Sequence, residues 1–115
     1  MLILSSMKKV AICQLNGRVA PRYDHSSEIV VFTVDDTCAI REKFVIPVGD
    51  MSAPDLTAFL GHLRVELVIC GGVREDYQQM IKRHDFGFID NIIGNIDDVI
   101  ACYVAGTLER GQVIS

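Results

Sequence analysis

The chain has few of the features that mark membrane, secreted and nucleic-acid-binding proteins. Its apolar runs are short and are broken by glycine, aspartate or charged residues, so no segment is long enough to cross a bilayer. The apolar stretch near the start follows no charged region and precedes no small-residue cleavage site, which argues against a signal peptide. We therefore expect a cytoplasmic protein with no membrane partner, translated from Met1 or from Met7.

Clustered basic residues and closely spaced cysteines are also scarce. The formal net charge is -4, and adjacent basic residues occur only at residues 8–9 and 82–83, which argues against a nucleic-acid partner. No two cysteines form a C-x-x-C motif, so neither a zinc ribbon nor a thioredoxin motif is present. In the cytosol we expect all of them to be reduced thiols: Cys13, Cys38, Cys70 and Cys102.

What the chain does contain is a regular alternation of short apolar segments with helical patterns. With 115 residues and no linker or repeat, it predicts one domain over residues 1–115, in which residues 1–7 are a disordered or dispensable start. Apolar runs predict strands at residues 10–13, 28–35, 40–48, 67–70 and 86–89, the second and third forming a hairpin. Residues 14–27 are rich in turn formers and predict a long loop.

Helical spacing of apolar residues predicts three helices. Ser52 is expected to cap the first, the second has an apolar stripe that includes Tyr77 and Ile81, and the third runs from its cap Asn95 to Gly106. The element order is therefore β-β-β-α-β-α-β-α, an α/β fold with a mixed sheet. Helical crossovers predict that the first strand and those at 67–70 and 86–89 are parallel.

A ligand crevice is expected where the chain leaves the first strand and the strand at 67–70 in opposite directions. Gly71 and Gly72 follow the second of these strands, allow a close backbone approach and precede a helix N-terminus, which favours an anion; a plain turn is the alternative. The loop after the first strand carries the densest basic group of the chain, and a solvated loop without a function remains equally open for it. Its notable residues are Arg18, Arg22, Tyr23 and His25.

Cys13 and Cys70 end these two strands with the same Ile-Cys pair. If the strands are neighbours, the two residues lie roughly 5 Å apart across the sheet. Burial as small hydrophobic side chains is favoured over a thiolate that binds a metal-sulfur group or takes part in redox chemistry.

In their order and spacing, several segments resemble the dinitrogenase iron-molybdenum cofactor biosynthesis family, which is nitrogenase accessory factor-like. The matching segments are residues 10–13, 17–21, 29–34, 68–72 and 101–108. The resemblance implies a ribonuclease-H-like three-layer fold with a mixed five-stranded sheet. It also implies a carrier or accessory protein rather than an enzyme, which holds an anionic metal-sulfur cluster such as the iron-molybdenum cofactor or another molybdenum-containing sulfide. Cofactor biosynthesis or recipient proteins are the partners implied.

One position departs from that family, which places His-Phe-Gly where this chain has Arg22, Tyr23 and Asp24. Arginine has no lone pair to give at neutral pH, so either His25 replaces the family's histidine or Arg22 holds the cluster through charge. We predict that one anion-accepting crevice has Cys13 at its floor and His25 and Cys70 as metal ligands. Its border is formed by Arg22, His25, Cys70, Gly71 and Gly72.

Three other functions compete with that of a carrier. A nuclease needs carboxylates gathered at strand ends, whereas the first strand has none and Asp35, Asp55 and Asp90 are scattered. A protein–protein interaction module of the same fold without a ligand remains open. So does a small-anion or nucleotide binder that uses Gly71 and Gly72, although the rest of a P-loop or dinucleotide fingerprint is missing.

Overall fold

The structure, a computed structural model, describes residues 7–114. The predicted dispensable start at residues 1–7 therefore lies, except for Met7, outside the described residues. Within residues 7–114, none of the helices has the length and apolar character needed to span a membrane.

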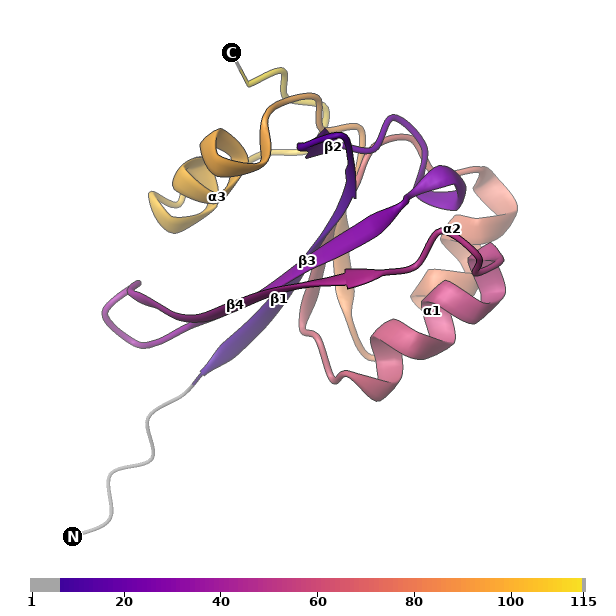
Figure 1. Ribbon diagram of the computed structural model, residues 1–115, viewed down its shortest axis with the longest axis horizontal. Coiled ribbons are helices and arrows are strands. Elements are labelled where there is room, and N and C mark those ends of the chain that lie inside the picture. The colour runs from indigo at the N-terminus through magenta and orange to yellow at the C-terminus, as the bar shows by residue number, and fades with distance from the viewer. Residues whose placement is uncertain (1–6, 115) are drawn as a thin grey trace, which may run out of the picture.

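A mixed sheet forms the middle of the molecule (Figure 1). Its main strands are β1 (Lys8–Leu15), β3 (Glu28–Val34), β4 (Ile40–Pro47), β5 (Leu67–Ile69) and β6 (Gly87–Ile89). They lie side by side in the order β4-β3-β1-β5-β6. The predicted pairings are confirmed: β1, β5 and β6 run parallel, while β3 and β4 form an antiparallel hairpin beside β1.

The described part of the chain also has three α-helices, namely α1 (Ala53–His62), α2 (Glu75–Lys82) and α3 (Ile96–Val104). Both predicted caps are confirmed. The Ser52 side chain accepts a hydrogen bond from the Asp55 N–H, and that of Asn95 accepts one from the Asp97 N–H. These bonds satisfy helix donors that would otherwise lack a partner, and so fix where α1 and α3 begin.

Helices cover both faces of the sheet and make three layers (Figure 1). Side chains alternate along β1, so Ala11 and Cys13 join the buried cluster under α1 and α2, while Val10 and Ile12 join the cluster under α3. Burial on both faces explains why the middle of β1 is a continuous apolar run.

The segment at residues 14–27 differs from the predicted long loop. β1 continues to Leu15, β2 (Arg18–Val19) pairs back onto it, and a 3-10 turn covers Tyr23–His25. Asn16 and Gly17 both have positive φ, 55° and 77°, which is the backbone shape of a tight two-residue hairpin turn. The α/β class is thus confirmed, and among residues 7–114 the sheet has six strands where five were predicted.

Candidate functional site

The carboxyl ends of β1 and β5 lie side by side, as the crevice hypothesis requires. Ile12 is in register with Ile69, and the chain after each strand stays close to the other. The Gly72 N–H donates to the Pro21 carbonyl at 2.8 Å, and the Tyr23 N–H donates to the Gly72 carbonyl at 2.9 Å. Backbone hydrogen bonds therefore join the basic loop, residues 18–25, to the glycine exit, which is the Gly71–Gly72 pair that follows β5.

Gly71 is required by this loop itself. A Cβ atom at position 71 would overlap the carbonyl oxygen of Ala20 and lie 2.5 Å from that of Pro21. At position 72 the nearest atom, the same Pro21 oxygen, would lie 3.4 Å away. The close backbone approach predicted for a ligand at Gly71 is thus made by the chain's own loop, and the space open to a ligand begins at Gly72.

A pocket of about 320 Å³ opens beside Gly72, within the usual range for small-molecule sites. Arg18 supplies its charged side chain and Asn91, in the left-handed region at φ 58°, supplies an amide. Its walls come from β2, the glycine exit and the chain after β6, so the elements that meet at the switch point of the sheet enclose it. The lining residues are Arg18, Val19, Pro21, Gly71, Gly72, Asn91, Ile92 and Ile93.

Arg22 and His25, the other predicted basic residues, lie on the outer surface of the loop, outside the lining of this pocket. Arg22 Nη2 lies 3.0 Å and His25 Nε2 3.5 Å from Asp24 Oδ2, while the Arg22 and His25 side chains are 54% and 66% exposed. The pKa of Arg74 is raised, chiefly by its hydrogen bond to Asp76 and to a smaller extent by Asp24. Arg22 and His25 thus share one carboxylate at the rim of the crevice, and Arg74 interacts electrostatically with the same group.

Asp24 is the acid at the centre of this group. Its side chain is 12% exposed, and Oδ1 is buried without a hydrogen-bond partner in the described structure. Oδ2 therefore pairs with Arg22, whereas Oδ1 has no hydrogen-bond donor among the described residues. A nearly buried carboxylate without its cation is costly, so an anion that binds Arg22 must compete with Asp24 for it.

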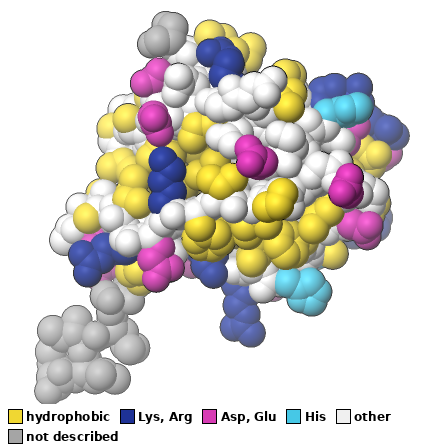
Figure 2. Space-filling view, in the orientation of Figure 1, with side chains coloured by type: hydrophobic (Ala, Val, Ile, Leu, Met, Phe, Trp, Pro, Cys, Tyr) yellow, Lys and Arg dark blue, Asp and Glu magenta, His cyan; other side chains and the backbone are white. Residues whose placement is uncertain are grey.

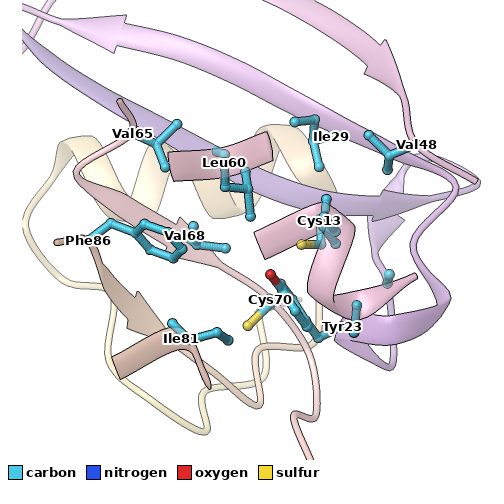
Figure 3. Close-up of a cluster of buried hydrophobic side chains, with 14 of the residues drawn as sticks. Cys13, Tyr23, Ile29, Val48, Leu60, Val65, Val68, Cys70, Ile81 and Phe86 are labelled. Carbon is cyan, nitrogen blue, oxygen red and sulfur yellow. The ribbon is translucent and has the colours of Figure 1, made fainter. Parts of the chain in front are cut away.

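The inner side of the loop is apolar and closed. Tyr23 is fully buried, and its hydroxyl lies 2.7 Å from Thr57 Oγ1. Because the Thr57 hydroxyl donates to the Ala53 carbonyl, the Tyr23 hydroxyl is the donor of this pair. Figure 3 shows Tyr23 among the buried side chains beside Cys13 and Cys70. The loop is therefore anchored in the core under α1.

Both predicted cysteines belong to this interior. Cys13 and Cys70 have no exposed surface, and burial raises the pKa of Cys13 to about 12 and that of Cys70 well above its ordinary value. Each is a neutral thiol beneath the loop at physiological pH. Roles for Cys13 at the floor of the site and for Cys70 as a metal ligand stay predictions, and both require the loop to lift. In residues 7–114, no three side chains of His, Cys, Asp or Glu are grouped as metal ligands.

A larger pocket, of about 690 Å³, lies at the opposite end of the sheet. His62, Arg64, Arg83 and His84 border it, next to the C-terminal ends of α1 and α2. Helix C-termini direct partial negative charge outward, and Glu66 and Asp85 add acidic groups. Despite its size, this pocket suits an anion less well than the one at the carboxyl ends of the strands.

Solved structures share this fold. The protein PH0822 superposes with a TM-score of 0.80 at 19% identity, over 89% of this chain and 93% of its own. A protein of Methanocaldococcus jannaschii, described provisionally as a dinitrogenase, gives 0.70 at 16% identity over 94% and 95%. The apo form of the orange protein from Desulfovibrio gigas gives 0.70 at 17% identity over 97% and 99%.

These likenesses show the fold. No family model matches the sequence. No curated protein matches it by sequence either.

Sequence reasoning overlooked the third strand end at this edge. Asp90 and Asn91 directly follow β6, which is parallel to β5, so they reach the same edge as Cys70. Asn91 lines the pocket, while the buried Asp90 accepts hydrogen bonds from Asn91 and from Arg110 beyond α3. The sequence signal for Asp90 and Asn91 was their position directly after a predicted parallel strand. No such signal existed for Arg110, because its contact with Asp90 depends on how the chain returns after α3.

Proposed function

We propose that this protein is a non-enzymatic carrier that holds a small anionic ligand at the carboxyl ends of β1 and β5. The ligand we propose is a molybdenum-containing sulfide cluster, such as the iron-molybdenum cofactor or a related species. The fold would then be the ribonuclease-H-like one that the sequence resemblance implies, and the carrier would work in the cytoplasm.

One observation carries the proposal, namely the pairing of the basic loop with the glycine exit beside an open pocket. The hydrogen bonds between Gly72 and residues 21 and 23 fix the backbone of the loop, so the segment that carries its basic residues is held beside Gly72. Arg18 is on the pocket wall, while Arg22 and His25 lie on the loop. Fixed positive charge at a strand-end crevice favours an anion.

The available side chains fit a metal cluster that brings its own sulfide ligands. Such a cluster needs charge and hydrogen-bond donors from the protein more than it needs thiolates. Arg18 offers a donor at the pocket, where the Asn91 amide nitrogen already donates to Asp90, and Arg22 offers charge-assisted hydrogen bonds at the rim. His25, whose imidazole is exposed, is the side chain best placed to bind a metal atom directly.

The structural neighbours add support at the level of the fold. One is described provisionally as a dinitrogenase, and another is the apo form of the orange protein, a description that implies a ligand-bound counterpart. The two share their fold with a chain whose segments resemble the cofactor biosynthesis family. Cofactor biosynthesis or recipient proteins would then be the carrier's partners.

The direct test is to titrate the purified protein anaerobically with tetrathiomolybdate and with iron-molybdenum cofactor, and to follow the visible absorbance. We expect a saturable change with one of these ligands, accompanied by a rise in the thermal midpoint. Inorganic phosphate and a nucleotide serve as comparison anions. Stabilisation by these alone would assign the site to a small-anion or nucleotide binder.

Paired variants locate the site. Arg22→Gln and His25→Gln should each weaken binding by about tenfold, because each removes a contact to the bound cluster. Arg83→Gln removes the same charge at the opposite end of the sheet and should leave binding within about twofold. Equal weakening by Arg22→Gln and Arg83→Gln would show that only net charge matters and would reject the loop as the site.

A further inference from the structure

The edge strand β4 is exposed at every residue except the half-buried Ile46, which is unusual for a strand of eight residues. Phe44 is 39% exposed and Val45 49%, although both side chains are large and apolar. Figure 2 shows hydrophobic side chains gathered over β4 and the neighbouring α1. An edge of this kind is a template for pairing with a further strand.

The two ends of β4 are protected against such pairing, whereas the middle is open. The pairing with β3 is irregular between Thr33 and Val34, which disturbs the edge near the hairpin turn. At the other end Pro47 has no N–H to donate. Lysine often guards an edge, but Lys43 Nζ lies 3.4 Å from Asp97 on α3, so its charge is partly neutralised.

The direction of each backbone group on β4 follows from one hydrogen bond. The Val48 N–H donates to the Ser27 carbonyl, so the backbone groups of residue 48 face β3. The direction of the backbone groups alternates along an antiparallel strand. The N–H and C=O of Ile46 and Phe44 therefore also point toward β3, whereas those of Val45 and Lys43 point outward. The unpaired donors and acceptors are therefore centred on Val45.

We propose that β4 pairs antiparallel with β4 of a second copy of this chain, about a two-fold axis at Val45. The two Val45 residues then exchange both backbone hydrogen bonds, and each Lys43 N–H donates to the carbonyl of the second copy's Pro47. Across the axis Val45 meets Val45, and each Phe44 meets the second copy's Ile46. The exposed apolar side chains of the edge become cross-strand pairs.

The positions of the charged residues on β4 favour this register, and they favour a second copy of the chain as the partner. A register centred on Lys43 would place two lysines directly opposite each other, and one centred on Phe44 would set Lys43 against Val45, one residue from the axis. In the register centred on Val45, every charged residue lies away from the axis and opposite an uncharged one. A strand that matches itself so well at one register needs no foreign partner.

Charge reversal at the axis tests this pairing specifically. Sedimentation of the full chain from roughly micromolar to roughly millimolar concentration should show a monomer–dimer equilibrium. Val45→Lys and Val45→Glu should each raise the dissociation constant about thirtyfold or more, because like charges then meet across the axis. An equimolar mixture of the two variants should recover dimers, since unlike charges now meet.

The matched control is Val113→Lys, which adds the same charge at an exposed valine outside β4. It should leave the dissociation constant within about twofold. Recovery in the mixture also shows that both variants are folded. A wild-type chain that stays monomeric throughout overturns the proposal and leaves the edge to a strand of another protein; dimers that persist in both single variants overturn it as well.

Discussion

The loop at residues 20–26 has two sides with opposite properties. On its inner side Tyr23 and Ser26 are buried, their polar atoms are bonded within the chain, and the loop backbone packs against Gly71. On its outer side Arg22 and His25 are exposed and share one carboxylate with each other. The inner side thus sets where the loop lies, while the outer side is free to exchange partners. Changes inside should alter stability, and changes outside should alter binding.

Gly71→Ala should give the largest effect on stability. The added methyl group would overlap the Ala20 carbonyl, so we expect the free energy of unfolding to fall by about 3 kcal/mol as the loop is forced off the strand ends. Urea denaturation followed by circular dichroism measures this change. Gly49→Ala is the matched control, because its Cβ would lie 3.7 Å from the nearest atom, the Ser27 oxygen. A similar loss in both variants would mean that the loop does not depend on close packing at Gly71.

The second-largest effect on stability should appear at alkaline pH, through the buried thiol of Cys13 beneath the loop. Burial raises the pKa of Cys13 from its ordinary value of 9.0 to about 12, so the native thiol keeps its proton where the unfolded chain releases it. Its contribution to stability is complete below pH 9 and is lost as pH rises from about 9 to about 12. The expected slope is a loss of about 1 kcal/mol per pH unit in this window.

The slope can be assigned with two cysteine variants. Cys13→Ala should make the decline in unfolding free energy shallower between pH 9 and pH 10.5, roughly the range in which unfolding stays measurable, while the buried thiol of Cys70 keeps part of it. Cys38→Ala removes an exposed thiol and should leave the slope unchanged. An unchanged slope in Cys13→Ala would show that its thiol is not held protonated by burial.

Tyr23→Phe should cost less, because it removes only the hydroxyl that anchors the loop to α1. Thr57 keeps its bond to the Ala53 carbonyl but loses the donor from Tyr23, so we expect a loss of about 1 kcal/mol. Tyr103→Phe removes a hydroxyl from a residue on α3 that is only partly buried, and should change stability by less than about 0.5 kcal/mol. Thermal and urea unfolding of both variants make the comparison.

The same contrast explains what the sequence predicts and what it does not. Cap residues and parallel strands follow from local pattern, so Ser52, Asn95 and the pairing of β1 with β5 are confirmed. The dependence of Gly71 on Ala20 is a contact between distant segments, and no local pattern reveals whether a glycine admits a ligand or the chain itself. The roles of the candidate site residues stay predictions, because a basic loop that binds an anion and one that is only solvated have the same residue pattern.

The smallest predicted effect, and the one most specific to the outer side, concerns Asp24. Its carboxylate lies against Arg22 and His25, the side chains that an anionic ligand would use. Its Oδ1 has no hydrogen-bond partner in the described structure. Asp24→Asn should therefore tighten binding of the molybdenum sulfide about threefold, a change comparable to the loss of one exposed ion pair. Stability should move by less than about 0.5 kcal/mol.

Titration of Asp24→Asn beside Asp85→Asn distinguishes local competition from net charge, because Asp85 lies at the opposite end of the sheet. If both variants tighten binding equally, the overall charge of the protein controls affinity and the loop has no special part in it. If only Asp24→Asn tightens binding, the Asp24 carboxylate competes with the anionic ligand for the same side chains on the outer side of the loop.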